Sequence, residues 1–169
     1  MNMQDWYEGA RKRFGFDAWP RPSREDAQFR ARQVSLDLKE VETTWHREQR
    51  IPWGRKGYAD YYEERENGRH RIMVRISEYP SNDEARMALL REISFSMAVT
   101  LPRLDERGIQ IGDIGFTGHG EMDTGIIFVR HNMLVDVRSI GEEALSVREF
   151  AGAVDNFVIG TVKSQNRNR

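Results

Sequence analysis

The stretch YADYYEERENGRHRIMVRISEYPSNDEA, residues 58–85, decides the fold. It holds two segments of strand-forming residues, 58–65 and 69–79, on either side of Asn67-Gly68. Asn-Gly is the residue pair that best tolerates the positive φ angles of a tight hairpin turn. The apolar residues of the second segment share one face: Ile72, Val74 and Ile76. The stretch therefore predicts a β-hairpin with one buried face.

Two capping boxes predict two helices. In Ser81-Asn-Asp-Glu84 the hydroxyl and the carboxylate can satisfy N–H groups that a helix N-terminus leaves unpaired, and this helix is expected to reach about Ala98. Ser146-Val-Arg-Glu149 opens the second helix in the same way. The first apolar stripe consists of Ala85, Ala88, Leu89, Ile93 and Met97, and the second of Val147, Phe150, Ala151, Val154 and Val158.

Four further segments are expected to be strands or extended chain: Val34–Leu38, Ile109–Phe116, Ile126–Val129 and Met133–Ile140. The third is apolar throughout, which is typical of a central strand covered on both faces. His131-Asn132 supplies the turn into the fourth. Residues 45–56 are polar and aromatic and include Pro52 and Gly54, which favours an ordered loop.

The front of the chain resembles a helix and a linker. Residues 4–14 place Trp6, Ala10 and Phe14 on one helical face, and Gly15 ends that pattern. Two prolines within residues 17–22 favour extended backbone. The domain plan is a helix and Pro-containing linker over residues 1–30, one α+β domain over 31–163 and a polar tail over 164–169, which is expected to fray.

Strands, a hairpin, a capping box and a helix thus occur twice along the chain. The simplest layered arrangement is a two-layer α+β fold with one antiparallel sheet of five to seven strands. The two amphipathic helices are expected to pack on one face of this sheet, and a short helix precedes them at the N-terminus.

Composition excludes several classes of protein. The 169 residues include no cysteine, so disulfides, thiolate metal sites and cysteine nucleophiles are absent. No apolar run approaches the roughly 20 residues of a membrane-spanning helix, and the first residues lack the apolar core of a secretory signal. The chain as written suggests the cytoplasm, or an exported protein whose signal was removed. A net charge of −1 makes nucleic acid an unfavoured partner.

Aromatic and aliphatic residues are distributed unequally. Of 38 Leu, Ile, Val and Phe residues, 30 lie after residue 56, whereas 11 of the 17 aromatic residues lie at or before Tyr62. Aromatic rings beside Arg side chains can stack a ligand and bind its carboxylate or phosphate, and they are also typical anchors of protein interfaces. The candidate binding residues are Trp45, Arg47, Arg50, Trp53, Arg55, Tyr58, Tyr61 and Tyr62. Alternatively, the two Trp residues could cover the edge or end of the core, with Arg stems lying over them.

A glycine-rich stretch, residues 112–125, holds the alternative site. His119, Glu121 and Asp123 could ligate a divalent metal in a hydrolase, or could belong to a solvated hairpin loop. The glycine spacing does not fit phosphate-binding loops, and a strand rather than a helix follows. No Gly-x-Ser-x-Gly or Ser-x-x-Lys motif is present, so no catalytic residue and no cofactor is predicted.

The cadence of the later chain resembles small bacterial exported or lipoprotein-like α+β domains of unknown function, some with an architecture similar to PsbP and Mog1. The resemblance covers about residues 70–160. It rests on Ser81-x-x-Glu-Ala85, Ile111-Gly-Asp113, Ile127-Phe-Val-Arg-His-Asn132, Leu134-Val135 and a closing helix that ends near Asp155. It implies a two-layer antiparallel domain used for binding, with no catalytic residues to carry over.

The preferred hypothesis is a non-catalytic binding or accessory domain for a protein partner or small ligand, with residues 1–62 as its contact surface. The first alternative is a metal-dependent hydrolase that uses the glycine-rich loop. The second is a structural subunit of a larger assembly, in which the helix around Trp6 is ordered only with its partners.

Overall fold

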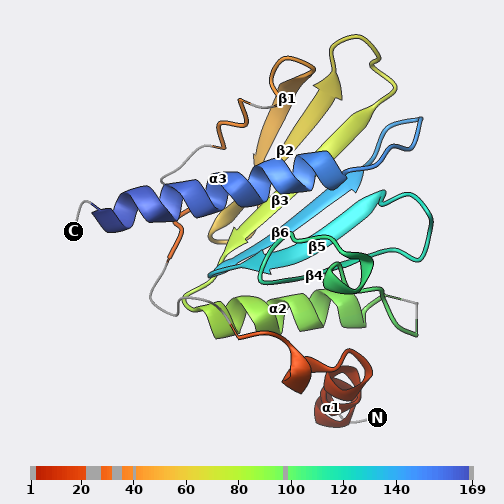
Figure 1. Ribbon diagram of the computed structural model, residues 1–169, viewed down its shortest axis with the longest axis vertical. Coiled ribbons are helices and arrows are strands. Elements are labelled where there is room, and N and C mark those ends of the chain that lie inside the picture. The colour runs from red at the N-terminus through yellow and green to blue at the C-terminus, as the bar shows by residue number, and fades with distance from the viewer. Residues whose placement is uncertain (1–2, 22–27, 32–35, 40, 97–98, 168–169) are drawn as a thin grey trace.

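One six-stranded antiparallel sheet in the order β1-β2-β3-β6-β5-β4 organises the computed structural model (Figure 1). The structure describes residues 3–21, 28–31, 36–39, 41–96 and 99–167. The strands are β1 (Trp45–Pro52), β2 (Gly57–Glu64), β3 (Arg71–Glu78), β4 (Ile114–Thr117), β5 (Gly125–Arg130) and β6 (Met133–Ser139). The helices are α1 (Met3–Arg13), α2 (Asn82–Ser94) and α3 (Arg148–Arg167), with short 3-10 turns at Phe16–Ala18 and Asp105–Arg107. The α+β class, the antiparallel sheet and the short N-terminal helix are confirmed.

The predicted hairpin forms strands β2 and β3. Tyr58 pairs with Ile76 and Tyr62 with Ile72, and the connection between the strands contains Asn67-Gly68 as expected. It is not the expected tight turn, because the last paired residues are Glu63 and Arg71 and neither Asn67 nor Gly68 has a positive φ. Strand β3 then pairs with β6, which joins the two halves of the sheet although they are about sixty residues apart in the chain. The turn at His131-Asn132 is also confirmed, with a positive φ of 54° at His131.

The two long helices line opposite faces of the sheet. Helix α3 lies across one face, packs on the alternating apolar residues of β3, β5 and β6, and forms with the sheet the layer of helix on sheet expected of the α+β fold (Figure 1). Helix α2 packs on the residues of β4, β5 and β6 that point to the opposite face: Ile114, Phe116, Val129 and Leu134. The structure differs from the expectation that both helices pack on one face. Strand residues 126–129 and 133–135 are apolar on both sides of the sheet, so each side must be buried by a helix.

The helix ends follow their capping residues. The Ser81 hydroxyl accepts a hydrogen bond from the Glu84 N–H at 3.2 Å, which confirms the first cap. Helix α2 ends at Ser94, before the expected Ala98, which lies outside the described residues. The second cap is weaker, because the Ser146 hydroxyl lies 3.4 Å from the Arg148 N–H. Helix α3 continues to residue 167, into the segment expected to fray.

Three extended segments differ from expectation. Residues 45–52, expected to form a loop, are the edge strand β1, whose outward faces are polar because it pairs on one side only. Strand β4 begins at Ile114 rather than Ile109, after Gly112 at a φ of +74°. Residues 36–39 are not a strand, although Leu36 and Leu38 are buried in the core under α3, and residues 32–35 lie outside the described part.

The N-terminal arm is held against the α2 side of the fold. The Trp19 indole donates a hydrogen bond to the Phe14 carbonyl, and Arg86 of α2 donates to the carbonyls of Trp19 and Pro20. Further along, the Asn132 side-chain amide exchanges hydrogen bonds with the backbone of Phe29. No helix in the described ranges is long and apolar enough to cross a membrane.

Candidate functional site

The eight predicted binding residues divide between the two faces of the sheet. Trp45 and Tyr62 pack in the core under α3, with ring centroids 5.7 and 4.9 Å from that of Phe150. Trp53, in the turn after β1, is 45% exposed, and Tyr61 is half-buried on the opposite side of β2 from Tyr62. Arg55 is exposed in the same turn. The structure therefore does not assemble the eight residues into one site.

Four of the eight surround Asp60, whose side chain is completely buried on the α3 face. Arg50 donates two hydrogen bonds of 2.6 Å to the two carboxylate oxygens, Arg47 lies 3.6 Å away, and the Tyr62 hydroxyl donates at 3.4 Å. The Arg50 guanidinium also stacks 3.9 Å from the centroid of the Tyr58 ring.

The electrostatics of the Asp60 cluster are those of a closed structural network. The hydrogen bond with Asp60 raises the pKa of Arg50. Burial raises the pKa of Tyr58 to about 12 and raises the pKa of Tyr62 as well. Because these groups satisfy one another inside the fold, they stabilise the β1–β2 pair and leave the opposite sheet face as the binding candidate.

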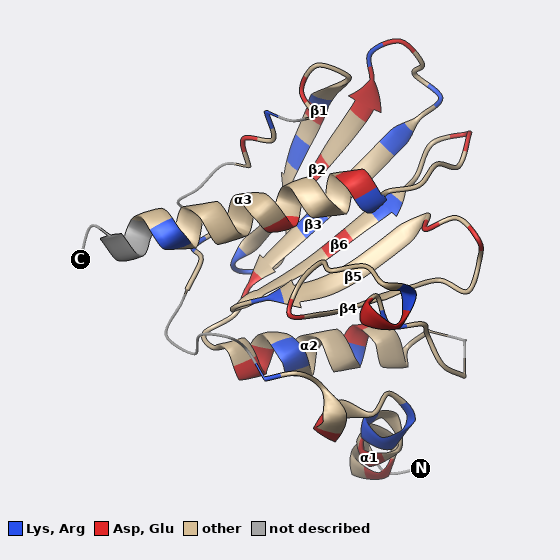
Figure 2. Ribbon diagram, viewed as in Figure 1, with Lys and Arg blue, Asp and Glu red and all other residues tan. Residues whose placement is uncertain are grey.

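The opposite side of the sheet, which we call the open sheet face, carries a second polar cluster. It is the surface of β1, β2, β3 and β6 turned away from α3 and not covered by α2, and the charged residues of these strands are marked in Figure 2. Strand pairing places Arg75 opposite both Ala59 of β2 and Asp136 of β6. The members used below are Trp53, Tyr61, Arg75, Asp136 and Arg138.

Asp136 is the fixed centre of the open sheet face. Its side chain is 3% exposed, yet it accepts a 3.0 Å hydrogen bond from Arg75 and bonds of 2.9 and 3.0 Å from the Nε of Arg138. Arg75 also pairs with Glu92 of α2 at 3.2 Å, and its guanidinium lies 4.9 Å from the Trp53 ring centroid. The carboxylate thus orients two arginines, and one of them holds a tryptophan.

Arg138 presents the exposed end of this cluster. Its side chain is 55% exposed, and only its Nε has a hydrogen-bond partner within the described residues, which leaves the terminal nitrogens as donors toward solvent. The hydrogen bond with Asp136 raises the pKa of Arg138, so the guanidinium stays charged. Beside it lies a cleft of about 390 Å³, lined by Arg138, Asp136, Thr117, Thr124, Phe116 and Ile127.

The arrangement suits an anionic group attached to an apolar one. A guanidinium can bind a carboxylate or phosphate through two parallel N–H donors. The cleft is within the size range of small-molecule sites, and its lining combines one aromatic ring and aliphatic side chains with a few polar groups. Trp53, in the turn after β1, and Tyr61 of β2 add aromatic surface to the open sheet face.

The residues of the glycine-rich loop have separate surroundings. Asp123 is buried and accepts hydrogen bonds from Arg107, Arg148 and Thr117. Burial alone would raise the pKa of Asp123, but the hydrogen bonds from Arg148 and Thr117 lower it below its usual value. The His119 ring lies 2.6 Å from the Thr100 carbonyl, and Glu121 is exposed. Within the described ranges these three side chains do not converge as metal ligands.

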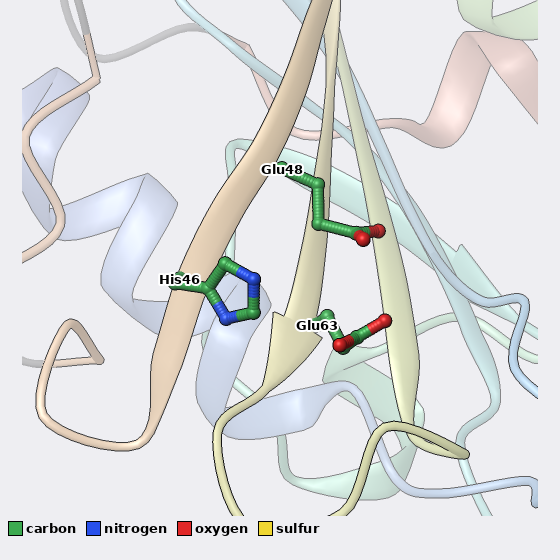
Figure 3. A group of neighbouring side chains, drawn as sticks. All are labelled: His46, Glu48 and Glu63. Atoms are coloured by element: carbon green, nitrogen blue, oxygen red, sulfur yellow. The ribbon is translucent and has the colours of Figure 1, made fainter.

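A different trio could offer metal ligands at the β1–β2 edge. One ligand atom each from His46, Glu48 and Glu63 lies within 4.8 Å of the others (Figure 3). Arg71 already occupies the carboxylates: its Nε donates to Glu63 at 3.0 Å, and its guanidinium lies 3.7 Å from Glu48. This hydrogen bond from Arg71 lowers the pKa of Glu63. The cluster is therefore an ion-pair network with its own cation.

Sequence reasoning missed Arg75, Asp136 and Arg138. One signal was available, because Asp136 interrupts the apolar residues 133–137 in the middle of a strand. What it pairs with follows only from the register of β3 against β6, which brings Arg75 beside it from 61 residues away.

Searches of protein-family models, curated proteins and solved structures find no match to this chain. The resemblance to exported α+β domains with a PsbP- or Mog1-like architecture therefore stays a prediction.

Proposed function

We propose that the protein is a non-catalytic binding domain whose contact surface is the open sheet face. The ligand, a small molecule or a segment of a protein partner, carries a carboxylate or phosphate next to an apolar or aromatic group. The observation that carries the proposal is the exposed Arg138 fork, which Asp136 orients at the mouth of the cleft.

Preorganisation supports this proposal. Asp136 accepts a hydrogen bond from the Nε of Arg138 and so restrains this side chain. Binding an anion therefore costs less side-chain entropy than it would for a mobile arginine. Trp53 is held in a similar way by the guanidinium of Arg75. Both recognition elements thus have defined positions before a ligand arrives.

The test uses phenyl phosphate as the probe, with phenol and inorganic phosphate as its two halves. Arginine Nε–H and tryptophan indole resonances are followed by nuclear magnetic resonance during titration. Phenyl phosphate should shift the signals of Arg138 and Trp53 at lower concentration than either half. Arg138→Gln should weaken binding roughly tenfold or more, since hydrogen bonds to charged groups contribute about 1.5–3 kcal/mol.

Arg69→Gln is the matched control, because Arg69 is similarly exposed but pairs with Glu142 and Glu143 on another surface. It should leave the affinity unchanged. Shifts that are equal in wild type and Arg138→Gln, or that require only the phosphate, would contradict the proposed site. Trp53→Leu separates the two contributions, since it removes the ring and keeps the guanidinium fork.

A further inference from the structure

A cleft of about 390 Å³ lies between α3 and the chain that leads into β4, and we call it the α3 cleft. Its apolar lining includes Leu104, Ile111 and Ile159, and no aromatic residue lines it within the described part of the chain. Three charged residues of its lining bind one another: Asp113, Arg130 and Asp155. The α3 cleft shares no lining residue with the cleft beside Arg138, so the two are separate sites.

Arg130 of β5 is held between two buried carboxylates. Its Nε and one terminal nitrogen donate to Asp155 at 2.7 Å, and the other terminal nitrogen donates to Asp113 at 2.9 Å. Both aspartate side chains are 5% exposed. Burial alone would lower the pKa of Arg130, but the hydrogen bond with Asp155 and the attraction of both carboxylates raise it. The guanidinium therefore stays charged.

The backbone fixes the two carboxylates as well. The Gly112 N–H donates to Asp155 at 3.0 Å, and the His131 N–H donates to Asp113 at 2.8 Å. Both donors have a positive φ, 74° at Gly112 and 54° at His131. A side chain at positive φ is unusual, and such positions cluster at binding and catalytic sites, where the surrounding structure enforces them. The charged network thus has a defined position before any ligand binds.

This network has hydrogen-bonding capacity left over. A guanidinium has five N–H groups, and three of those of Arg130 have partners within the described residues. A carboxylate oxygen can accept two hydrogen bonds. Both oxygens of Asp113 and one of Asp155 accept a single bond from the described residues. The lining of the α3 cleft therefore offers N–H donors and carboxylate acceptors side by side.

The charge balance favours a ligand with no net charge. Arg103 and Asp105, the other charged residues of the lining, pair with each other. The two network carboxylates have the guanidinium between them and also Arg86 of α2, which is buried near Asp113. Burial lowers the pKa of Arg86, and the attraction of the exposed Asp83 and of Asp113 opposes this shift. Two buried negative charges thus lie near two buried positive ones, and an added unpaired charge would be costly.

We propose that the α3 cleft binds a free aliphatic amino acid. The ammonium group of the ligand donates to the carboxylates of Asp113 and Asp155, and its carboxylate accepts from the remaining N–H groups of Arg130. The aliphatic side chain lies against Leu104, Ile111 and Ile159. The volume is near the lower end of the range for small-molecule sites, which suits a ligand of this size.

Titration calorimetry of the full chain with L-leucine tests the proposal. The two halves of this probe are 3-methylbutylamine, which lacks the carboxylate, and 4-methylpentanoate, which lacks the ammonium group. Leucine should bind at least about tenfold more tightly than either half, because each half leaves charged groups of the cleft without a partner. In nuclear magnetic resonance spectra, leucine should shift the Arg130 Nε–H and the Gly112 N–H signals. Equal affinity for leucine and one of its halves, or no binding up to about 10 mM leucine, overturns the proposal.

Two variants locate the bound amino acid. Asp155→Asn should weaken leucine binding at least about tenfold, since it removes one charged acceptor of the ammonium group. Ile159→Glu places an acid at a half-buried position of the cleft without changing the network, and it should weaken binding by a similar factor even if Asp155→Asn fails to fold. Ile140→Glu, the same change at a 44% exposed position outside the cleft, is the matched control. Circular dichroism shows whether each variant is folded. Unchanged affinity in folded Ile159→Glu, or an equal loss in Ile140→Glu, overturns the assignment to the α3 cleft.

Discussion

Replacing Asp60 with Asn should lower the free energy of unfolding by about 2–3 kcal/mol. Removing one partner of a buried ion pair costs roughly 3–5 kcal/mol, because the other charge stays in the interior. The side chains of Arg50 and Arg47 are 29% and 38% exposed, so both can turn toward water once the carboxylate is gone. This relaxation lowers the expected cost to the smaller figure, about 2–3 kcal/mol.

Urea denaturation followed by tryptophan fluorescence measures this change, and the slope against urea should stay the same. The control is Asp17→Asn, since Asp17 also pairs with an arginine at 2.6 Å but is 83% exposed. Its expected cost is about 0–0.5 kcal/mol. If the Asp60 and Asp17 variants lose the same stability, the account of Asp60 as a buried centre is refuted.

A double variant tests whether charge causes the loss. Adding Arg50→Gln to Asp60→Asn removes the cation that has lost its carboxylate partner. The two changes should therefore cost less together than their sum, by at least about 1 kcal/mol. Strict additivity would show that packing around the two strands, rather than the ion pair, accounts for the effect.

Two further predictions concern a glycine and the buried tyrosines. Gly112→Ala should lower the free energy of unfolding by about 2–4 kcal/mol, because residue 112 has a positive φ and an added Cβ would lie 2.7 Å from Phe128. Gly108→Ala, at a similar φ but with open space around the Cβ, should lower it by about 1–2 kcal/mol. Equal losses of stability in thermal denaturation would contradict the clash at Gly112. Since burial raises the pKa of Tyr58 to about 12, the folded chain keeps a proton that the unfolded chain loses near pH 10, and stability should fall as the pH rises from about 10 to 12. Tyr58→Phe should flatten that fall in urea midpoints, and an unchanged pH dependence would argue against the buried hydroxyl.

Short-range features of the fold were predictable because neighbouring residues create them. Asn67 supports its turn by accepting a hydrogen bond from the Arg69 N–H on its side-chain oxygen, and Ser81 caps α2 through a residue three positions away. Strand β1 could not be predicted in this way. It is an edge strand with polar outward residues, so its pairing with β2, rather than its own pattern, makes it a strand.

The candidate site divides in the same manner. Trp53 and Tyr61, two of the predicted binding residues, lie on the open sheet face, and their binding of a ligand stays a prediction. Trp45 and Tyr62 are the same residue types, but they point to the other face of the sheet and are buried in the core. Parity in β1 also shifts at the bulge between Arg47 and Gln49, which no composition count reveals.

By itself, the sequence determined the α+β class, the central hairpin, the first helix cap and the exclusion of cysteine chemistry, since each depends on residue identity or local spacing. The tertiary structure decided which face each helix covers and which charges meet. The apolar residues of β5 on both sides require two covers, and the β3–β6 register brings Arg75 to Asp136. Such contacts join residues far apart in the chain, and their energies depend on burial that only the assembled sheet and helices create.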